Sequence, residues 1–294
     1  MAADHASTDA RALEAGLDAL ESLVVPVTAA RSRAAWAACW PTAAAVVAFA
    51  GVWQAVALAK VKPSYALPGP ADVWAAFVLA VQDGTAARAV GLSLERAGLA
   101  FIVSVVVGVL LGTALATVRL LRRALGPVIT GLQSLPSVAW VPAALIWFQL
   151  SNAAIFSVVL LGAVPSVVNG LLAGVDQVPP LFLRVGQVLG ASGWVRIRHI
   201  LLPAALPGFL AGLRQGWAFA WRSLMAAELI AASPQLGTGL GQLLDLGRQT
   251  NDMALVVAAI LLIFAVGLTI ELLVFSPLER RALRLRGLTA AGDR

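Results

Sequence analysis

Cysteine and histidine are almost absent from this sequence. Cys39 is the single cysteine, and His5 and His199 are the only histidines among 294 residues. One cysteine cannot form a disulfide within the chain, and so few Cys and His side chains cannot supply a multi-ligand Cys/His metal site. No arrangement typical of a catalytic triad is visible either. We therefore expect no metal, no cofactor and no covalent chemistry in this chain.

Charged side chains are also scarce. They make up 12% of the residues, whereas hydrophobic side chains make up 60%, and the mean hydropathy is +0.88. A soluble domain is about one quarter charged, so this chain has too little polar surface for an ordinary soluble protein. Several apolar runs reach the ~20 residues that span a bilayer as a helix. The composition therefore predicts an all-α integral membrane protein.

The net charge of +6 has an uneven distribution along the chain. Arginines gather in short segments at the ends of apolar runs, in the way that cytoplasmic loops of membrane proteins do. The basic balance therefore indicates orientation in the membrane and not a nucleic-acid-binding face. The two clusters contain Arg119, Arg122 and Arg123, and Arg280, Arg281, Arg284 and Arg286.

Six apolar stretches predict six transmembrane helices. If the cluster at Arg119 is cytoplasmic, the segment 178–202 and both termini lie on the same side. The N-terminus lacks a short apolar run with a cleavage site, so we expect no removed signal peptide. The predicted spans are 36–59, 97–118, 126–150, 153–173, 204–230 and 254–275.

The segments between these spans complete the predicted organisation. Residues 71–82 carry aromatic side chains and are expected at the membrane interface, and the polar segment 231–252 is expected to fold over the outer mouth. The sequence has no internal repeat, which argues against a secondary transporter built from inverted repeats. The expected divisions are a cytoplasmic segment 1–34, either a short amphipathic helix or a loose tail, a first span with its connector 35–65, a transmembrane domain 66–280 and a cytoplasmic tail 281–294.

One basic, glycine-rich segment interrupts the apolar runs at residues 178–203, which we call the elbow. Its first half has an apolar stripe formed by Leu181, Val185, Val188 and Leu189. Gly190 is suited to end that helix because glycine readily takes the left-handed conformation. Ser192 is placed to cap a second short helix that carries Trp194 and Ile197, and Pro203 and Pro207 are expected to mark the hand-over to the fifth span.

The elbow resembles the signature loop of the permease subunits of bacterial ABC importers that use an external binding protein, in their sulfonate, nitrate and taurine branch. That signature is E-A-A, three residues, G, nine residues, I-x-L-P. Gly190, Ile200, Leu202 and Pro203 match it, whereas Arg184, Val185 and Gly186 stand where E-A-A is expected. The resemblance extends over residues 65–280 and includes LPGP (67–70), LPSVAWVPAALIWF (135–148) and AAELIAASPQLGTGL (226–240).

The resemblance implies a MetI-like type I importer fold with six transmembrane helices in the bacterial inner membrane. It implies a second permease copy, two ATP-binding subunits and an extracytoplasmic solute-binding protein as partners. In that family the loop docks on the ATP-binding subunit, and Arg184 would reverse a charge there. The implied coupling residues are Arg184, Val185, Gly186, Gly190, Ala191, Ser192, Gly193, Ile200, Leu202 and Pro203.

The positions of the lysines indicate that ATP is hydrolysed by a different subunit. A P-loop requires G-x-x-x-x-G-K-[ST], in which backbone amides and the lysine hold phosphates. Lys60 and Lys62 are the only lysines, and neither lies in that pattern. We therefore expect ATP hydrolysis on a separate subunit, and this chain is expected not to be an enzyme.

The fifth predicted span carries Arg214, Arg222 and Glu228. Charged side chains inside a membrane are costly and face protein or water. Two interpretations follow: the span lines a path that attracts an anion, or an arginine pairs with Glu228 or with backbone carbonyls for structural reasons. The candidate path residues are Gln133, Trp140, Arg214, Trp217, Trp221, Arg222 and Glu228.

Two other classes of function compete with an ATP-driven permease. A secondary transporter needs titratable groups within the membrane, and Glu228 is the one carboxylate placed for that role. A channel needs a filter-like loop, and none is visible. The solute stays open at this stage, because relatives in the branch carry sulfonates, taurine, nitrate and uncharged heterocycles.

Overall fold

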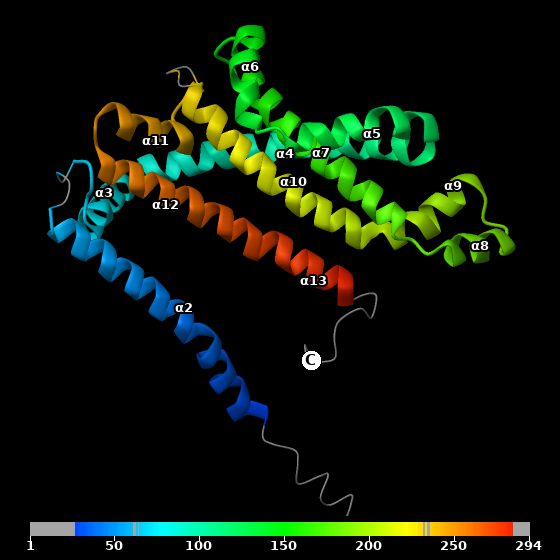
Figure 1. The fold of residues 1–294 in the computed structure, drawn as a ribbon, viewed down its shortest axis with the longest axis horizontal. Coiled ribbons are helices and arrows are strands. Elements are labelled where there is room, and N and C mark those ends of the chain that lie inside the picture. Colours follow the sequence, from blue (N-terminus) through cyan, green and yellow to red (C-terminus); the bar gives the residue numbers. More distant parts are fainter. Residues whose placement is uncertain (1–26, 61–62, 64, 232, 234–235, 285–294) are drawn as a thin grey trace, which may run out of the picture. The chain divides into compact units, whose positions relative to one another are not determined.

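The computed structural model describes residues 27–284 except 61–62, 64, 232 and 234–235 (Figure 1). Every regular element in that part of the chain is a helix, as predicted. The chain divides into two units, Met1–Val61 and Lys62–Arg294. The first unit contains α2 (Val27–Leu58), which covers most of the predicted first span. The predictions for residues 1–26 and 285–294 lie outside the described residues.

The second unit contains the remaining helices, two of which are interrupted by π-helical turns. In Figure 1, α10 runs alongside α7 and α12. The elements are α3 (Pro70–Gln82), α4 (Thr85–Thr117), α5 (Arg119–Ser134), the 3-10 turn η1 (Ser137–Trp140), α6 (Val141–Phe148), α7 (Asn152–Asp176), α8 (Pro180–Val188), α9 (Gly193–Arg196), the π turn η2 (Ile197–Leu201), α10 (Leu202–Ile230), α11 (Leu240–Gln249), α12 (Met253–Ile270), the π turn η4 (Glu271–Phe275) and α13 (Ser276–Arg284).

Three helices among the described residues are long and apolar enough to cross a membrane: Thr85–Thr117, Asn152–Asp176 and Met253–Ala282. The pair Arg119–Ser134 and Ser137–Phe148 qualifies as a fourth, broken span. The 29-residue α10 is long enough but is not among them, because charged and polar side chains lower its mean hydropathy. Length and composition therefore do not by themselves establish the predicted count of six.

Two predicted spans differ from the observed helices. The second begins at Thr85 and not at residue 97, so that Arg96 lies within α4. The third is not one continuous helix, because α5 and η1–α6 are bent by 100°. The bend falls next to Pro136, which sits in extended backbone before η1. Proline lacks the N–H needed to continue the helix, and this explains the break.

Glycines set the close packing of the second unit. Gly170 and Gly174 of α7 face Gly212 and Gly208 of α10, and a Cβ on any of the four would overlap the backbone opposite. Each pair is spaced by four residues and therefore lies on one helix face. Small residues at this spacing let membrane helices approach until their backbones touch. The α7–α10 contact is thus fixed by two matching glycine faces.

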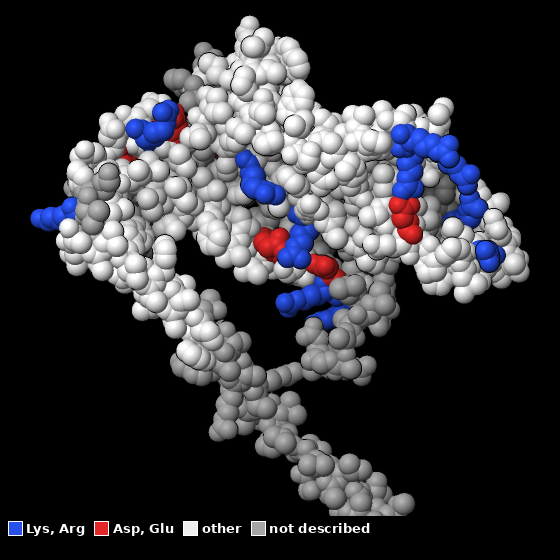
Figure 2. Space-filling model, viewed as in Figure 1, with Lys and Arg blue, Asp and Glu red and all other residues white. Residues whose placement is uncertain are grey.

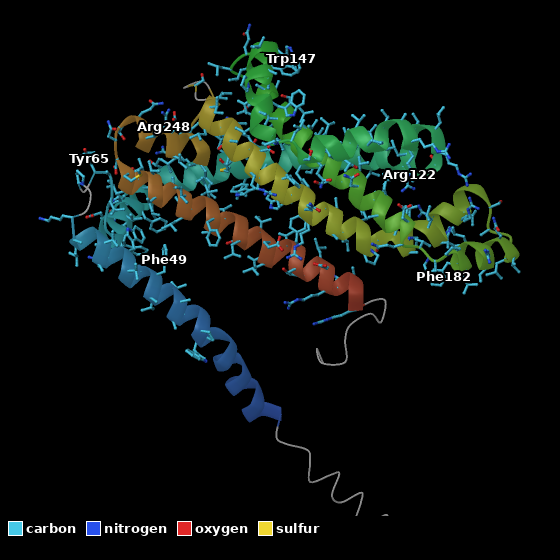
Figure 3. All side chains as sticks on the ribbon, in the orientation of Figure 1. Phe49, Tyr65, Arg122, Trp147, Phe182 and Arg248 are labelled. Atoms are coloured by element: carbon cyan, nitrogen blue, oxygen red, sulfur yellow. The ribbon has the colours of Figure 1, made fainter. Side chains whose placement is uncertain are left out.

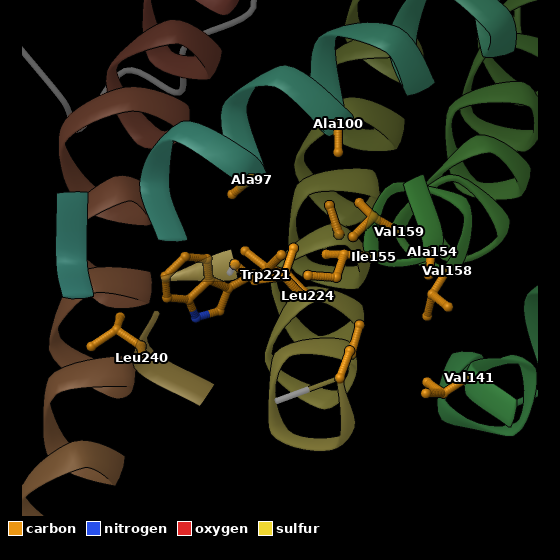
Figure 4. Close-up of a cluster of buried hydrophobic side chains, with 14 of the residues drawn as sticks. Ala97, Ala100, Val141, Ala154, Ile155, Val158, Val159, Trp221, Leu224 and Leu240 are labelled. Atoms are coloured by element: carbon orange, nitrogen blue, oxygen red, sulfur yellow. The ribbon is translucent and has the colours of Figure 1, made fainter. Parts of the chain in front are cut away.

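A cluster of buried side chains lies where α4, α6, α7, α10 and α11 converge (Figure 4). Ile155 of α7, Leu224 of α10 and Leu240 of α11 are fully buried in it. The polar segment 231–252 is therefore packed against the other helices through α11, whose Leu240 and Leu243 point into this cluster. This packing places the end of α10 next to α4 and the start of α11.

Candidate functional sites: the elbow and the charged residues of α10

The first half of the elbow is α8, and it ends as its sequence predicts. Gly190 has a φ of +78°. The Ala191 N–H donates to the Gly186 carbonyl at 2.8 Å, and the Gly190 N–H donates to the Gln187 carbonyl at 3.0 Å. These two bonds form a Schellman motif, which requires the left-handed conformation that glycine adopts without strain.

The second half of the elbow differs from the prediction. Instead of a separate short helix, α9, η2 and α10 follow one another without a break from Gly193 to Ile230. Ser192 contributes its backbone carbonyl, which accepts the Val195 N–H at 3.1 Å. Pro203 stands in the first turn of α10, where its missing N–H is tolerated. The side chains of Trp194 and Ile197 lie outside the described residues.

The two halves of the elbow meet at Gly186 and Ile200. A Cβ on Gly186 would overlap Cδ1 of Ile200, and Gly186 is buried. The structure thus brings the position of the missing E-A-A motif against the first residue of the I-x-L-P motif. Arg184 lies on the exposed side of α8.

The apolar stripe of α8 is present but largely uncovered. Val188 is 87% exposed and Leu189 is 80% exposed, and Phe182 lies at the end of the second unit that carries α8 in Figure 3. A groove of about 580 Å³ lies beside these side chains and is lined by Leu181, Phe182, Val185, Leu189, Ile200 and Pro203. An exposed apolar surface of this kind is one that a partner or lipid can cover.

Glu228 is fully buried near the end of α10 and is held by α4 and α11. Its Oε1 is 3.0 Å from Nη1 of Arg96, which is itself 3% exposed. Its Oε2 accepts the Ser93 hydroxyl at 2.8 Å and the Gly241 N–H at 3.1 Å. An ion pair therefore encloses the Glu228 carboxylate, the arrangement that the structural interpretation of this residue requires.

Arg96 connects Glu228 to two further segments. Its Nε donates to Oδ1 of Asn152, the first residue of α7, at 3.1 Å, and its Nη2 donates to the Leu236 carbonyl. The structural interpretation of Glu228 is thus the one observed, with Arg96 as the arginine. The sequence reasoning overlooked Arg96, although its place just before a long apolar run was a signal.

The two remaining arginines of α10 have different surroundings. Arg214 forms ion pairs with Glu271 and, at 3.0 Å, with Glu279. The Nε of Arg222 donates to the Ala218 carbonyl at 3.0 Å, and its guanidinium lies 4.6 Å from the centre of the Phe219 ring. Among the described residues, Arg222 has no acidic partner in an ion pair. Figure 2 shows basic and acidic side chains lying side by side near the middle of the face in view.

The other candidate path residues mostly pack within the protein. Trp217 and Trp221 are 8% and 7% exposed, and their rings stack with centroids 6.2 Å apart. They still reach a groove of about 480 Å³ between α10 and α12, which Arg222 also lines. Gln133 donates to the Ser166 hydroxyl of α7 at 3.2 Å. Trp140 packs against the buried cluster.

Comparison with known proteins identifies the family. Residues 104–283 match the model of the binding-protein-dependent transport system inner membrane component. The chain is 28% identical over 236 residues to the nitrate import permease protein NrtB of Synechococcus elongatus, covering 77% of this chain and 84% of that protein. It is 31% identical over 226 residues to the taurine transport system permease protein TauC of Escherichia coli, covering 75% and 81%.

Two further comparisons agree with this assignment. The bicarbonate transport system permease protein CmpB of Synechococcus elongatus is 31% identical over 179 residues, covering 61% of this chain and 63% of that protein. The fold is similar to a chain in an inward-facing structure of the MetNI methionine ABC transporter, with a TM-score of 0.52, 18% identity, and coverage of 67% and 95%. The chain belongs to the family of binding-protein-dependent transport system inner membrane components, and is accordingly a multi-pass permease subunit and not an enzyme.

Proposed function

We propose that this chain is one of two identical permease subunits that import a small anion, and that each copy docks an ATP-binding subunit on its elbow. The observation that carries the proposal is the elbow itself. Its exposed apolar side chains, Val188 and Leu189 among them, have no cover among the described residues. Exposing such side chains to water is unfavourable at roughly 25 cal/mol per Å², so a protein partner at this surface is favoured.

The end of the second unit that bears the elbow is proposed to face the cytoplasm. Nη1 of Arg122, near the start of α5, lies 2.9 Å from Oδ1 of Asp176, the last residue of α7. The arginine cluster after α4 and the elbow therefore lie close together. Basic clusters of this kind are retained on the cytoplasmic side. A cysteine introduced at the exposed Gln187, in a Cys39→Ser background, is expected to react with a membrane-impermeant maleimide in inside-out vesicles and to be protected in right-side-out vesicles.

Docking on the elbow is tested by recovery of the ATP-binding subunit with the permease. Leu189→Glu is expected to reduce that recovery severely, because it places a charge in an apolar contact. Leu246→Glu is the matched control, since Leu246 is 45% exposed on α11, at the opposite end of the second unit in Figure 1. Equal recovery with wild type and Leu189→Glu would contradict docking on the elbow.

An anionic solute is favoured by the surroundings of Arg222. Its guanidinium lines the groove between α10 and α12 without an acidic partner among the described residues. The relatives named above are named for nitrate, taurine and bicarbonate, and each of these carries an anionic group. Glu271 also lines this groove, but it is paired with Arg214, so the positive charge of Arg222 remains available to attract such a solute.

Uptake measurements test the anion and the role of Arg222 together. Proteoliposomes with the ATP-binding subunit and loaded binding protein are expected to accumulate labelled nitrate, taurine or bicarbonate. Arg222→Gln is expected to lower uptake without lowering recovery of the ATP-binding subunit, whereas Arg248→Gln on α11 is the exposed-arginine control. Transport restricted to uncharged solutes, or full uptake with Arg222→Gln, would contradict an anion path at Arg222.

The proposed pairing of two identical copies has its own measurement. The mass of the purified permease complex, determined by light scattering with the detergent contribution subtracted, is expected to correspond to two copies of this chain and two ATP-binding subunits. A complex that always contains a second, different permease would contradict a homodimer.

A further inference from the structure

We propose that Arg96 and Glu228 are positioning residues that make α11 move with α10, so that a signal at α11 reaches the elbow. The inference rests on the proposed function, since it assumes that the elbow contacts the ATP-binding subunit and that α11 lies on the side of the binding protein. Its own content is the mechanical link between the two ends of α10.

One end of the link is the carboxylate of Glu228, which joins three helices. Arg96 and Ser93 reach it from α4, and the Gly241 N–H reaches it from α11. The Ser93 hydroxyl also accepts the Leu240 N–H, at 2.8 Å. The start of α11 is therefore bonded both to Glu228 and to the serine that holds Glu228.

Glycines allow α11 to begin directly over this carboxylate. A Cβ on Gly239 would overlap both carboxylate oxygens of Glu228, and a Cβ on Gly241 would come within 2.7 Å of Glu228 Cβ. Only glycine leaves room for the backbone at such a distance. The close approach lets a backbone N–H bond to the carboxylate, and this bond ties the position of α11 to that of α10.

The other end of the link is the elbow. Helical structure continues from Gly193 through η2 to Ile230, a length of about 55 Å at 1.5 Å per residue. Glu228 stands two residues before the end of that helix, and the elbow contact between Gly186 and Ile200 lies near its start. A displacement of the elbow is thus carried along one helix to the residues that hold α11.

The buried charges explain why the link resists breaking. Separating α11 and α4 from α10 would leave Arg96 or Glu228 charged and unpaired in a largely buried site, which is strongly unfavourable. Arg96 is further held by Asn152 of α7 and by the Leu236 carbonyl. The ends of α4, α7, α10 and α11 at this site therefore move together, and conformational change is directed to other places.

The experiment measures ATP hydrolysis by the assembled complex in proteoliposomes, with and without loaded binding protein. Glu228→Gln keeps the size of the side chain but removes its charge and replaces one acceptor oxygen by a donor NH2 group. Arg96→Lys keeps the charge but cannot reach all the partners of the guanidinium. Both variants are expected to retain basal hydrolysis, while the ratio of stimulated to basal hydrolysis falls by at least about fivefold, the lower end of typical coupling between sites.

A merely structural pair gives a different result. It predicts that basal and stimulated hydrolysis fall together, in proportion to the amount of assembled complex, with an unchanged stimulation ratio. That outcome, or full stimulation in both variants, would overturn the proposal. The control Arg248→Lys lies on the same helix and keeps a cation beside its ion-pair partner Asp245, so it is expected to leave the ratio unchanged.

Two further variants keep the test decisive if Glu228→Gln assembles poorly. Ser93→Ala removes a hydroxyl that bonds both Glu228 and the Leu240 N–H and leaves the ion pair intact, so it is expected to lower the stimulation ratio partially. Glu228→Asp in the same assay is expected to restore more of the ratio than Glu228→Gln. Failure of the proposed function would appear separately, as unchanged recovery of the ATP-binding subunit with Leu189→Glu.

Discussion

Gly170 of α7 and Gly212 of α10 meet backbone to backbone, and a Cβ built on either glycine would overlap the Cα of the other. Substitution of Gly212 by valine is therefore expected to separate the two helices or distort them. Overpacking of a well-packed site costs typically 1–3 kcal/mol, and here backbone atoms cannot rotate out of the way. The thermal midpoint of the purified permease in detergent is expected to fall by several degrees.

A glycine on α4 supplies the control. A Cβ on Gly98 would meet no atom within 4 Å, and alanine is the better helix former by about 1 kcal/mol. Gly98→Ala is therefore expected to leave the thermal midpoint unchanged or to raise it slightly. Equal midpoints for wild type and Gly212→Val would show that the α7–α10 contact is looser than described.

Gly190 provides a test of the elbow's shape that leaves its apolar side chains intact. A residue with a Cβ in the left-handed conformation costs roughly 1–2 kcal/mol, so Gly190→Ala is expected to loosen the end of α8. Asparagine tolerates this conformation better, and Gly190→Asn should be milder. Gly126→Ala on α5, where a Cβ meets no atom within 4 Å, is the control. The measurement is the amount of ATP-binding subunit that co-purifies with each variant, and the order wild type, Asn, Ala is expected.

The end of α8 at Gly190 could be predicted from the sequence, because one residue and its neighbours decide where a helix ends. The same rules could not find the pair of Arg96 and Glu228, which are 132 positions apart in the chain. Periodicity gives the face on which a residue lies, but not which helix that face meets. The predicted second span begins at residue 97, directly after Arg96, although α4 begins at Thr85.

Some features of the elbow could be predicted from the local sequence, and others depend on the tertiary structure. Its apolar stripe, its terminating glycine and its basic character follow from the sequence. The continuity of α9, η2 and α10 does not, because Pro203 normally marks a boundary and only the preceding π turn joins the helices. The glycine contacts of α7 and α10 were also missed, since each glycine alone is consistent with a turn or a kink.

Arg184 occupies the place of an acid in the signature of the family, and it lies exposed on α8. We expect the ATP-binding partner to carry a complementary acidic group at this contact. Arg184→Glu is then expected to weaken coupling, measured as transport per ATP hydrolysed, because like charges face each other across the contact. Gln187→Glu, also exposed on α8, controls for added negative charge. Normal coupling with Arg184→Glu and the native partner would refute a complementary acid.

Arg214 joins α10 to η4 and to α13 through two carboxylates that differ in exposure. Glu271 has a side chain 27% exposed, whereas that of Glu279 is 39% exposed, and Oε1 of Glu271 is buried with Arg214 as its ion-pair partner. Glu279→Gln is expected to change stability little, since exposed pairs contribute about 0–1 kcal/mol.

Arg214→Gln is expected to lower stability more than Glu279→Gln does, because it leaves a partly buried carboxylate without a partner. Combining Arg214→Gln with Glu271→Gln should then restore part of the loss, with an interaction energy in the range of about 0.5–3 kcal/mol. The measurement is the thermal midpoint of Arg214→Gln, of Glu271→Gln and of the double variant. Strictly additive shifts would show that Arg214 and Glu271 act independently.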